Sequence, residues 1–251
     1  VCTLGGNIAT RAGGPRGVKY GTTERYVTGL EVVLPDGSVV SPGGKVIKQS
    51  SGYDLTHLMT GSEGTLGVIT SAHLRILPMP SAKRTVVVTC STVDQAAEIV
   101  SGIIAEGAVP AMLEFLPKLA ITVLNSYLKP PLPLLGDAYL FMELDGSASQ
   151  VEEETVQIKK ICTGMGAVDV RVVADENESS TYWWARSMLY PGMLRLFKRV
   201  ITEDVTVPRN MIPEFVRRVQ AIAAGCGVLI GIAGHAGDGN MHPTIMHTEL
   251  S

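Results

Sequence analysis

The stretch Thr85-Val-Val-Val-Thr-Cys-Ser-Thr-Val-Asp-Gln-Ala-Ala-Glu-Ile-Val-Ser-Gly-Ile-Ile104 decides the fold class, because its pattern changes from strand to helix within a few residues. The residues from Thr85 to Cys90 are typical of a β-strand. From Val93 onward the apolar residues recur at helical spacing and form one face that can pack on a sheet. Thr92 and Gln95 have the spacing of a capping box at the start of this helix. The stretch therefore predicts a strand followed directly by a helix.

The same alternation continues along the rest of the chain. Strands are predicted at 111–115, 137–144, 168–172, 203–207 and from residue 227 onward, and helices near 149–162, 177–189 and 213–224. Ser149 and Glu152 predict a second capping box. These spacings predict an α+β architecture in which helices cover a largely antiparallel sheet.

The first 80 residues are rich in turns instead. Pro35-Asp-Gly37 lies between strand-like residues 30–34 and 38–40 and predicts a hairpin, because Pro fixes φ and Gly accepts a positive φ. Residues 68–76 predict a long strand that is partly buried on both faces. Pro78-Met-Pro80 ends that strand, so we predict two domains, 1–80 and 81–251.

Composition excludes several classes of protein. The chain has 251 residues, 45% of them hydrophobic, with a net charge of -3, which excludes disorder. Its 21 basic and 24 acidic residues give no basic excess, so we expect no nucleic-acid partner. The 27 glycines are about 11% of the chain against a usual ~7%, and they are clustered. Such segments must turn tightly or approach a ligand closely.

The cysteines and the two ends bear on compartment and completeness. The four cysteines form no Cys-x-x-Cys pair, so we expect reduced, mostly buried thiols in a cytoplasmic protein. No apolar run has the length of a transmembrane segment, and no secretion signal is visible. Because the chain starts at Val1 and residues 247–251 follow a strand-like stretch without a closing element, we expect a piece of a longer protein.

The first glycine-rich segment, Leu4-Gly-Gly-Asn-Ile-Ala-Thr-Arg-Ala-Gly-Gly14, can present backbone N–H groups to an anion. It matches neither the Gly-x-Gly-x-x-Gly dinucleotide fingerprint nor a P-loop. Plain tight turns are the alternative explanation of this segment alone. Further motifs follow in order: Gly52-Tyr-Asp-Leu55, Thr60-Gly-Ser-Glu-Gly-Thr-Leu-Gly-Val-Ile-Thr70 and Gly234-His-Ala-Gly-Asp-Gly-Asn-Met-His-Pro243.

Together these motifs resemble the FAD-linked oxidases of the vanillyl-alcohol-oxidase/p-cresol-methylhydroxylase type. The resemblance is greatest to the branch that oxidises D-2-hydroxy acids such as glycolate, D-lactate and D-2-hydroxyglutarate. It implies that 1–80 form the C-terminal half of an FAD-binding domain and that 81–251 form an antiparallel-sheet cap domain flanked by helices. The residues that it places along FAD are Gly5, Gly6, Asn7, Thr10, Gly13, Gly14, Gly67, Val68 and Ile69.

The resemblance also indicates departures from the family. Arg11 stands where relatives often have Asn, which puts that polar contact to FAD in doubt. The family's upstream half-domain would precede Val1. A Glu-His-Gly segment, which supplies a metal ligand and a catalytic histidine, would follow Ser251. The isolated chain is therefore expected to be inactive.

A second candidate site lies at the Asp238-Gly239 turn. A two-residue turn centred there would pair His235 directly with His242 and Gly237 with Asn240. Two opposed imidazoles, with Cβ atoms ~5 Å apart, can reach one divalent cation at ~2.1 Å. A histidine pair bonded to water or a carboxylate is the alternative. The resemblance implies the metal, zinc or a similar divalent ion, with Asn240 facing the flavin.

Arg186 is the candidate for binding a substrate carboxylate. Its guanidinium can form two parallel charge-assisted hydrogen bonds. From the sequence alone, an ion pair with Asp175 or Glu178 is the alternative. The resemblance favours substrate binding, because Trp183 and Arg186 have the Trp-x-x-Arg spacing of the related dehydrogenases.

The predicted activity is oxidation of a D-2-hydroxy acid to its 2-oxo acid by hydride transfer to flavin N5, with Arg186, His235, His242 and Asn240 at the reacting centre. The partners expected are a small 2-hydroxy acid and an electron-transfer or iron-sulfur subunit. Such a subunit could hold the protein at the periphery of a membrane. Two alternatives remain: a non-catalytic fragment or assembly subunit that keeps the fold, and a hydrolase with a histidine-bound metal.

Overall fold

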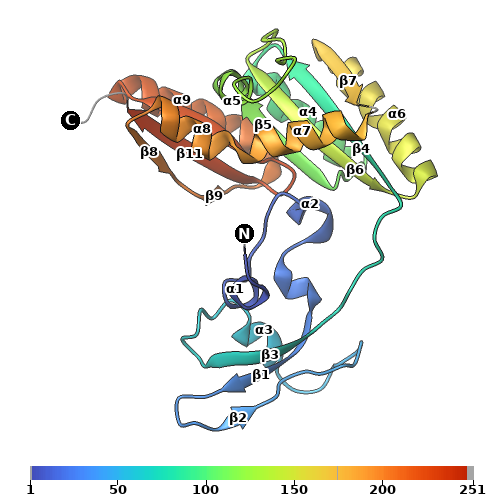
Figure 1. The fold of residues 1–251 in the computed structure, drawn as a ribbon, viewed down its shortest axis with the longest axis vertical. Coiled ribbons are helices and arrows are strands. Elements are labelled where there is room, and N and C mark those ends of the chain that lie inside the picture. Colours follow the sequence, from blue (N-terminus) through green and yellow to red (C-terminus); the bar gives the residue numbers. More distant parts are fainter. Residues whose placement is uncertain (1, 174, 248–251) are drawn as a thin grey trace. The chain divides into compact units, whose positions relative to one another are not determined.

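The computed structural model describes residues 2–173 and 175–247. The chain divides into two compact units, Val1–Met79 and Pro80–Ser251 (Figure 1). No helix of the described chain is long and apolar enough to cross a bilayer.

The first unit contains a three-stranded antiparallel sheet with the order β2-β1-β3. Its core consists of apolar side chains from α1 and β1. The elements are α1 (Leu4–Ala9), α2 (Gly17–Tyr20), η1 (Thr23–Tyr26), β1 (Val27–Val33), β2 (Val39–Val40), α3 (Leu55–Met59) and β3 (Val68–Leu74), and the core residues are Ile8, Val27, Leu30 and Val32.

The predicted hairpin at Pro35-Asp-Gly37 is confirmed. Gly37 has a φ of 83°, and the carboxylate of Asp36 accepts a hydrogen bond from the Ser38 N–H at 2.9 Å. Burial of β3 on both faces is not observed within this unit, because Val68 is 63% exposed. Only one face of β3, with Ile69 and Ala72, packs on the core.

The second unit is built on an eight-stranded sheet in which every pairing is antiparallel. The order is β7-β4-β6-β5-β10-β11-β8, with β9 paired to β11. The strands are β4 (Ala82–Cys90), β5 (Met112–Pro117), β6 (Ala138–Gly146), β7 (Asp169–Val173), β8 (Arg199–Thr202), β9 (Val205–Thr206), β10 (Leu229–His235) and β11 (Asn240–His247).

Helices cover both faces of this sheet (Figure 1). On one face lie α4 (Val93–Ala105), α6 (Ala148–Gly164) and α9 (Ile212–Cys226), and on the other α5 (Lys118–Leu124), α7 (Glu176–Ser187) and α8 (Leu189–Leu196); η2 is Arg209–Met211. The alternation of side chains gives each face its own apolar core. Val86 and Leu140 belong to the first core, and Val87 and Phe141 to the second. The predicted α+β class with an antiparallel sheet flanked by helices is confirmed.

The helix starts differ in detail from the two predicted capping boxes. Thr92 caps α4 by accepting from Gln95 N–H, but the Gln95 side chain accepts from Ser91 N–H instead of closing the box. The complete box at α6 is formed by Ser147 and Gln150, so the assignment to Ser149 and Glu152 was wrong. Serines two residues apart offer the same pattern, and only the backbone decides which of them precedes the first turn.

All four cysteines are free, but only half of them are buried: Cys90 and Cys162 are buried, and Cys2 and Cys226 are exposed. The prediction that most of the thiols are buried is therefore correct for two of the four cysteines. Burial raises the pKa of both Cys90 and Cys162 to about 12, so these thiols resist ionisation.

Candidate functional site

The hairpin of β10 and β11 carries both candidate histidines, but its register differs from the prediction. His235 is paired with Asn240, and His242 with Ala233. The loop between the strands has four residues, 236–239, and the His235 carbonyl accepts from the N–H groups of Asp238 and Gly239. The prediction was wrong because Asp238-Gly239 forms the second half of a longer turn.

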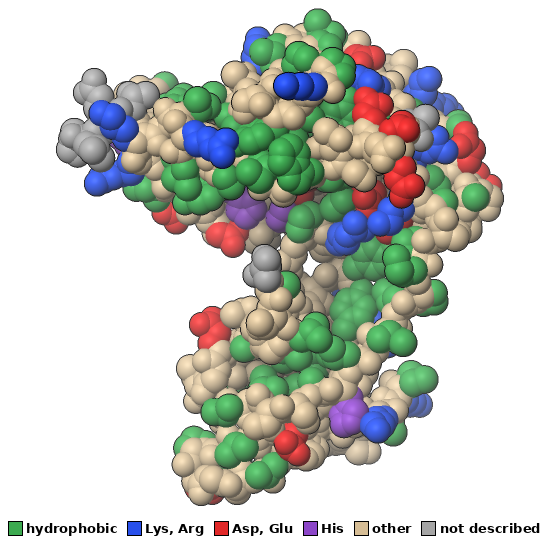
Figure 2. Space-filling model, in the orientation of Figure 1, with side chains coloured by type: hydrophobic (Ala, Val, Ile, Leu, Met, Phe, Trp, Pro, Cys, Tyr) green, Lys and Arg blue, Asp and Glu red, His purple; other side chains and the backbone are tan. Residues whose placement is uncertain are grey.

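The histidines nevertheless share a face, because His235 and His242 are diagonal neighbours across the strand pair. Their ring centroids are 5.1 Å apart and the rings are nearly perpendicular, at 85°. Gly239 has a positive φ of 83°, and the Asp238 carboxylate accepts a hydrogen bond from the Asn240 N–H at 3.2 Å. Histidine and acidic side chains are both visible along one edge of this unit (Figure 2).

Glu114 connects the two halves of the site, and the sequence analysis missed it. It lies on β5 opposite His235, and its side chain is buried. One carboxylate oxygen, Oε1, forms a short hydrogen bond with Nδ1 of His235. The other, Oε2, accepts from Nε of Arg186 at 2.8 Å and also from its Nη2. One buried carboxylate thus contacts both candidate groups.

The charges at this carboxylate shift the neighbouring pKa values. Burial raises the pKa of Glu114, but the charge of Arg186 and the hydrogen bond with His235 outweigh it, so that the pKa lies below its ordinary value. Burial lowers the pKa of His235, but Glu114 outweighs it, and the net shift is upward. Burial and the nearby His235 charge lower the pKa of His242. The two imidazoles therefore differ in their affinity for protons.

Arg186 lies in the last turn of α7 and is partly buried, with 20% of its side chain exposed. The alternative ion pairs with Asp175 and Glu178 do not form, because Asp175 caps α7 and Glu178 pairs with Arg171. Within the described ranges, Nη1 of Arg186 has no hydrogen-bond partner, so the outer edge of the guanidinium can still accept an anion.

Trp183 holds the same helix against the sheet. Its indole Nε1 donates to the hydroxyl of Thr85 on β4 at 2.9 Å, and its ring meets Phe141 edge-on. The predicted Trp-x-x-Arg spacing therefore separates an anchoring residue, Trp183, from one that faces the polar site, Arg186.

Asn240 and Asp204 complete the polar surroundings. The Oδ1 atom of Asn240 is buried and has no hydrogen-bond partner in the described chain. Nδ1 of His242 lies 3.4 Å from the carboxylate of Asp204, which is 74% exposed and lies between β8 and β9. Asn240 pairs with His235 across the hairpin, and an unpartnered buried oxygen on the strand pair that carries two imidazoles fits a bound cation.

The described residues alone do not close a metal site. No group of three or more His, Cys, Asp or Glu side chains able to hold a metal occurs among residues 2–173 and 175–247. His235 and His242 provide two ligands, and a zinc or similar ion needs more.

The residues predicted along FAD lie in the first unit, and two of the glycines among them leave open space. A Cβ added at Gly5 or Gly14 would meet no atom within 4 Å, so packing within the unit does not require glycine there. This openness fits a closely approaching ligand. The side chains of two neighbours have local partners: Thr10 donates to the carbonyl of Gly6, and Asn7 donates to the sulfur of Cys2.

Other glycines in the predicted set have a structural reason. A Cβ on Gly6 would lie 2.9 Å from the capping hydroxyl of Thr3, and one on Gly13 would lie 3.3 Å from Thr22. Gly67 packs closely on β1, where a Cβ would lie 2.8 Å from the carbonyl of Val33. Val68 and Ile69 follow on β3, an edge strand of the described sheet, so their backbone groups on the outer edge can meet a ligand.

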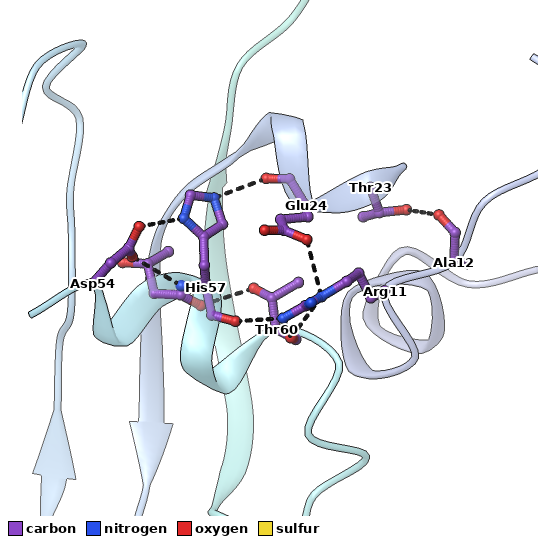
Figure 3. Close-up of polar contacts among 8 residues, drawn as sticks. Arg11, Ala12, Thr23, Glu24, Asp54, His57 and Thr60 are labelled. Atoms are coloured by element: carbon purple, nitrogen blue, oxygen red, sulfur yellow. Dashed lines mark hydrogen bonds and ion pairs between the residues drawn. The ribbon is translucent and has the colours of Figure 1, made fainter. Parts of the chain in front are cut away.

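Arg11 has a clear local role (Figure 3). Its φ is 52°, a left-handed conformation that Asn tolerates better than most residues. Its guanidinium donates to the carbonyls of Thr60 and His57 and pairs with Glu24 at 3.0 Å. This conformation is one that Asn would also adopt readily, and the Arg11 side chain is used to hold the unit together.

His57 also belongs to this network (Figure 3). Its Nδ1 forms a 2.5 Å hydrogen bond with Asp54, and its Nε2 lies 3.1 Å from the carbonyl of Glu24. The hydrogen bond with Asp54 raises the pKa of His57 and lowers the pKa of Asp54. The pair ties α3 to η1.

Comparison with known proteins identifies the class. Residues 79–250 match the family model of the FAD linked oxidases, C-terminal domain, and residues 1–43 match an FAD binding domain. The chain therefore belongs to the FAD-linked oxidase family. The predicted resemblance is confirmed. The match of residues 1–43 to an FAD binding domain also supports FAD as the cofactor.

Particular relatives narrow the comparison. The chain is 43% identical to glycolate oxidase subunit GlcD of Bacillus subtilis over 97% of its own length and 52% of that protein. It is 37% identical to a D-lactate dehydrogenase of Archaeoglobus fulgidus, over 96% of the chain and 53% of that protein. The chain spans about half the length of these relatives.

Solved structures agree on the fold. An alkyldihydroxyacetonephosphate synthase matches with a TM-score of 0.73 at 18% identity, over 98% of this chain and 51% of that one. A 4-ethylphenol oxidase from Gulosibacter chungangensis matches with a TM-score of 0.70 at 14% identity, over 98% and 55%.

Proposed function

We propose that the intact protein oxidises a small D-2-hydroxy acid, such as glycolate or D-lactate, to the 2-oxo acid. The observation that carries this proposal is the grouping of Arg186, His235 and His242 around Glu114 on one sheet face. The relatives named glycolate oxidase subunit and D-lactate dehydrogenase support this substrate class.

The residues divide the work according to their chemistry. The free edge of the Arg186 guanidinium can bind the substrate carboxylate with two charge-assisted hydrogen bonds and so orient the adjacent carbon. His235 and His242 would hold a divalent metal, such as zinc, through imidazole nitrogens, and Asn240 Oδ1 can accept a hydrogen bond from the substrate or a bound water. When bound, FAD would accept the hydride and the cation would polarise the substrate hydroxyl.

The first unit would contribute to the FAD site along Gly5, Gly6, Asn7, Thr10, Gly13 and Gly14, with backbone groups of Gly67, Val68 and Ile69 beside them. Support comes from the match to an FAD binding domain and from the open space at Gly5 and Gly14.

We further propose that a partner subunit reoxidises the flavin. Such a subunit would hold the protein at the periphery of a membrane. The support is the word "subunit" in the name of the Bacillus relative. Copurification of the intact protein with a redox subunit that restores turnover tests this point, and full turnover by the protein alone with a quinone would contradict it.

The decisive experiment measures flavin bleaching under anaerobic conditions in the intact protein, with D- and L-lactate and glycolate as substrates. We expect bleaching and 2-oxo acid formation with glycolate and the D-enantiomer. Arg186→Lys should raise KM by about 10–100-fold, because lysine cannot reproduce the two-point contact. Arg171→Lys, whose partner is Glu178, is the matched control and should leave KM unchanged. Absence of flavin or of bleaching would favour the non-catalytic alternative, and bound metal without flavin would favour the hydrolase.

A further inference from the structure

Glu114 is an unusual residue for its position. It lies between Leu113 and Phe115 on a strand whose residues are almost all buried, and its own side chain is fully buried. Burial of a carboxylate is unfavourable unless charged or hydrogen-bonding partners compensate for it, and an apolar side chain would fill such a position at lower cost. Packing alone therefore does not explain why a carboxylate occupies this position.

Both of its partners belong to the proposed site, and each oxygen contacts a different one. Oε1 contacts His235, which is 121 residues further along the chain, and Oε2 contacts Arg186, which is 72 residues further along. A single rigid group thus holds one side chain from β10 and one from α7.

The contact with His235 determines which ring nitrogen is available. A carboxylate accepts a hydrogen bond, so Nδ1 keeps its proton when the ring is neutral, and Nε2 then has the lone pair that a metal needs. Metal-binding histidines commonly have this arrangement, in which the second nitrogen donates to a carboxylate. Among the described residues, His242 has no buried carboxylate of this kind, since Asp204 is exposed and lies 3.4 Å away. His235 is therefore the imidazole whose orientation is fixed in advance.

The contact with Arg186 determines which edge of the guanidinium is available. Nε and one hydrogen of Nη2 are engaged by Oε2. The outer edge, with Nη1 and the second hydrogen of Nη2, remains open to a substrate carboxylate. In a 2-hydroxy acid the hydroxyl and the carboxylate are on adjacent carbons, so the groups that bind them must keep a fixed separation.

From these contacts we infer that Glu114 is a positioning residue that sets His235 and Arg186 in register for the two functional groups of a 2-hydroxy acid. This inference rests on the proposed function and adds to it a residue that touches neither the substrate nor the cofactor. Glu114 acts on the metal side through the His235 tautomer and on the carboxylate side through the guanidinium orientation.

The test uses Glu114→Gln, which keeps the shape but has only one acceptor oxygen. If that oxygen serves Arg186, the amide N–H₂ faces Nδ1 of His235 and forces the proton onto Nε2. At a pH high enough for the ring to be neutral, we expect long-range ¹H–¹⁵N spectra of the metal-free protein to show an Nδ1–H tautomer for His235 and an Nε2–H tautomer in the variant. Affinity for Zn²⁺ alone should fall about 10–100-fold, as is typical when such a partner is lost, and KM for glycolate or D-lactate should rise.

Glu143→Gln is the matched control, because Glu143 is also buried and lies on the same sheet face, on β6. It should change neither the tautomer nor the Zn²⁺ affinity. A folded Glu114→Gln protein that keeps the Nδ1–H tautomer and the original Zn²⁺ affinity would overturn the inference. If the variant does not fold, the unsubstituted protein still decides, since an Nε2–H tautomer of its His235 contradicts the assignment. Failure of the proposed function is distinguishable, because it would remove turnover without altering the tautomer or Zn²⁺ binding.

Discussion

Replacement of Gly234 by Ala should disturb the strand pair that carries both histidines. Gly234 precedes His235 on β10, and an added Cβ would lie 2.4 Å from the carbonyl oxygen of Asn240 and 2.7 Å from Cα of Met241. Contacts under 3.0 Å are essentially never seen for Cβ atoms, so the backbones must separate by roughly 0.6 Å, the difference between 3.0 and 2.4. Backbone atoms of a central hairpin cannot rotate away as a side chain does.

The expected destabilisation follows from two opposing effects. Forced overpacking costs about 1–3 kcal/mol. Changing Gly to Ala also lowers the conformational entropy of the unfolded chain, which stabilises the folded protein by about 0.4–1 kcal/mol and offsets part of that cost. We therefore expect a net loss of about 1–2 kcal/mol and weaker Zn²⁺ binding by the separated histidines. Gly231→Ala on the same strand is the control, because the nearest atom there is the flexible methyl of Met246 at 3.1 Å.

Denaturant unfolding followed by tryptophan fluorescence is a suitable assay. The two tryptophans, Trp183 and Trp184, both lie on α7, so the signal reports on the second unit alone. The free energy of unfolding should fall for Gly234→Ala and stay within about 0.5 kcal/mol for Gly231→Ala, a range ordinary for mild substitutions. Equal stability of the two variants would refute the steric argument and the register from which it comes.

Three further predictions concern other parts of the chain. The pKa of His57, measured by NMR titration, should exceed its ordinary ~6.5 and fall back in Asp54→Asn; the stability from this raised pKa is fully present below ~6.5 and is lost as pH rises through the raised value. A thiol reagent should label the two exposed cysteines of the folded protein at once, and Cys90 and Cys162 only after unfolding; rapid labelling of four thiols would contradict their burial. Ser147→Ala should lower the stability of the second unit by about 1 kcal/mol because it removes the α6 cap, and no change in the denaturation midpoint would speak against that cap.

The spacing of residues along the chain was sufficient to predict the fold class and to predict that two histidines share one face of the sheet. Strands and helices at 85–104 follow from side-chain spacing over a few residues, and these elements form as expected. His235 and His242 share a face in the observed register as well as in the predicted one. The partner of His235 differs by two residues between the two registers, and an even shift leaves each side chain on the same face of the sheet. The register itself depends on the loop backbone, which the dipeptide Asp-Gly does not specify.

Glu114 shows what local pattern cannot provide. The only sign of it in the sequence is one carboxylate within an apolar strand, Met112-Leu-Glu-Phe-Leu116. Its partners lie 72 and 121 residues away, so no spacing rule connects them. The same holds for Arg11, whose partner Thr60 is 49 residues distant and whose role became visible only with its positive φ.

The amino-acid sequence by itself indicated the family, because its glycine-rich and histidine motifs occur in the order seen in FAD-linked oxidases. It also determined the antiparallel sheet with its helices, because these depend on short-range periodicity. Tertiary structure alone decided the hairpin register, the pairing of Arg186 with Glu114 rather than with its neighbours on α7, and the tautomer that this carboxylate imposes on His235. Hydrogen bonds between distant strands and helices form only when the sheet is assembled, and it is the strand order of that sheet that brings β5, β10 and α7 to one point.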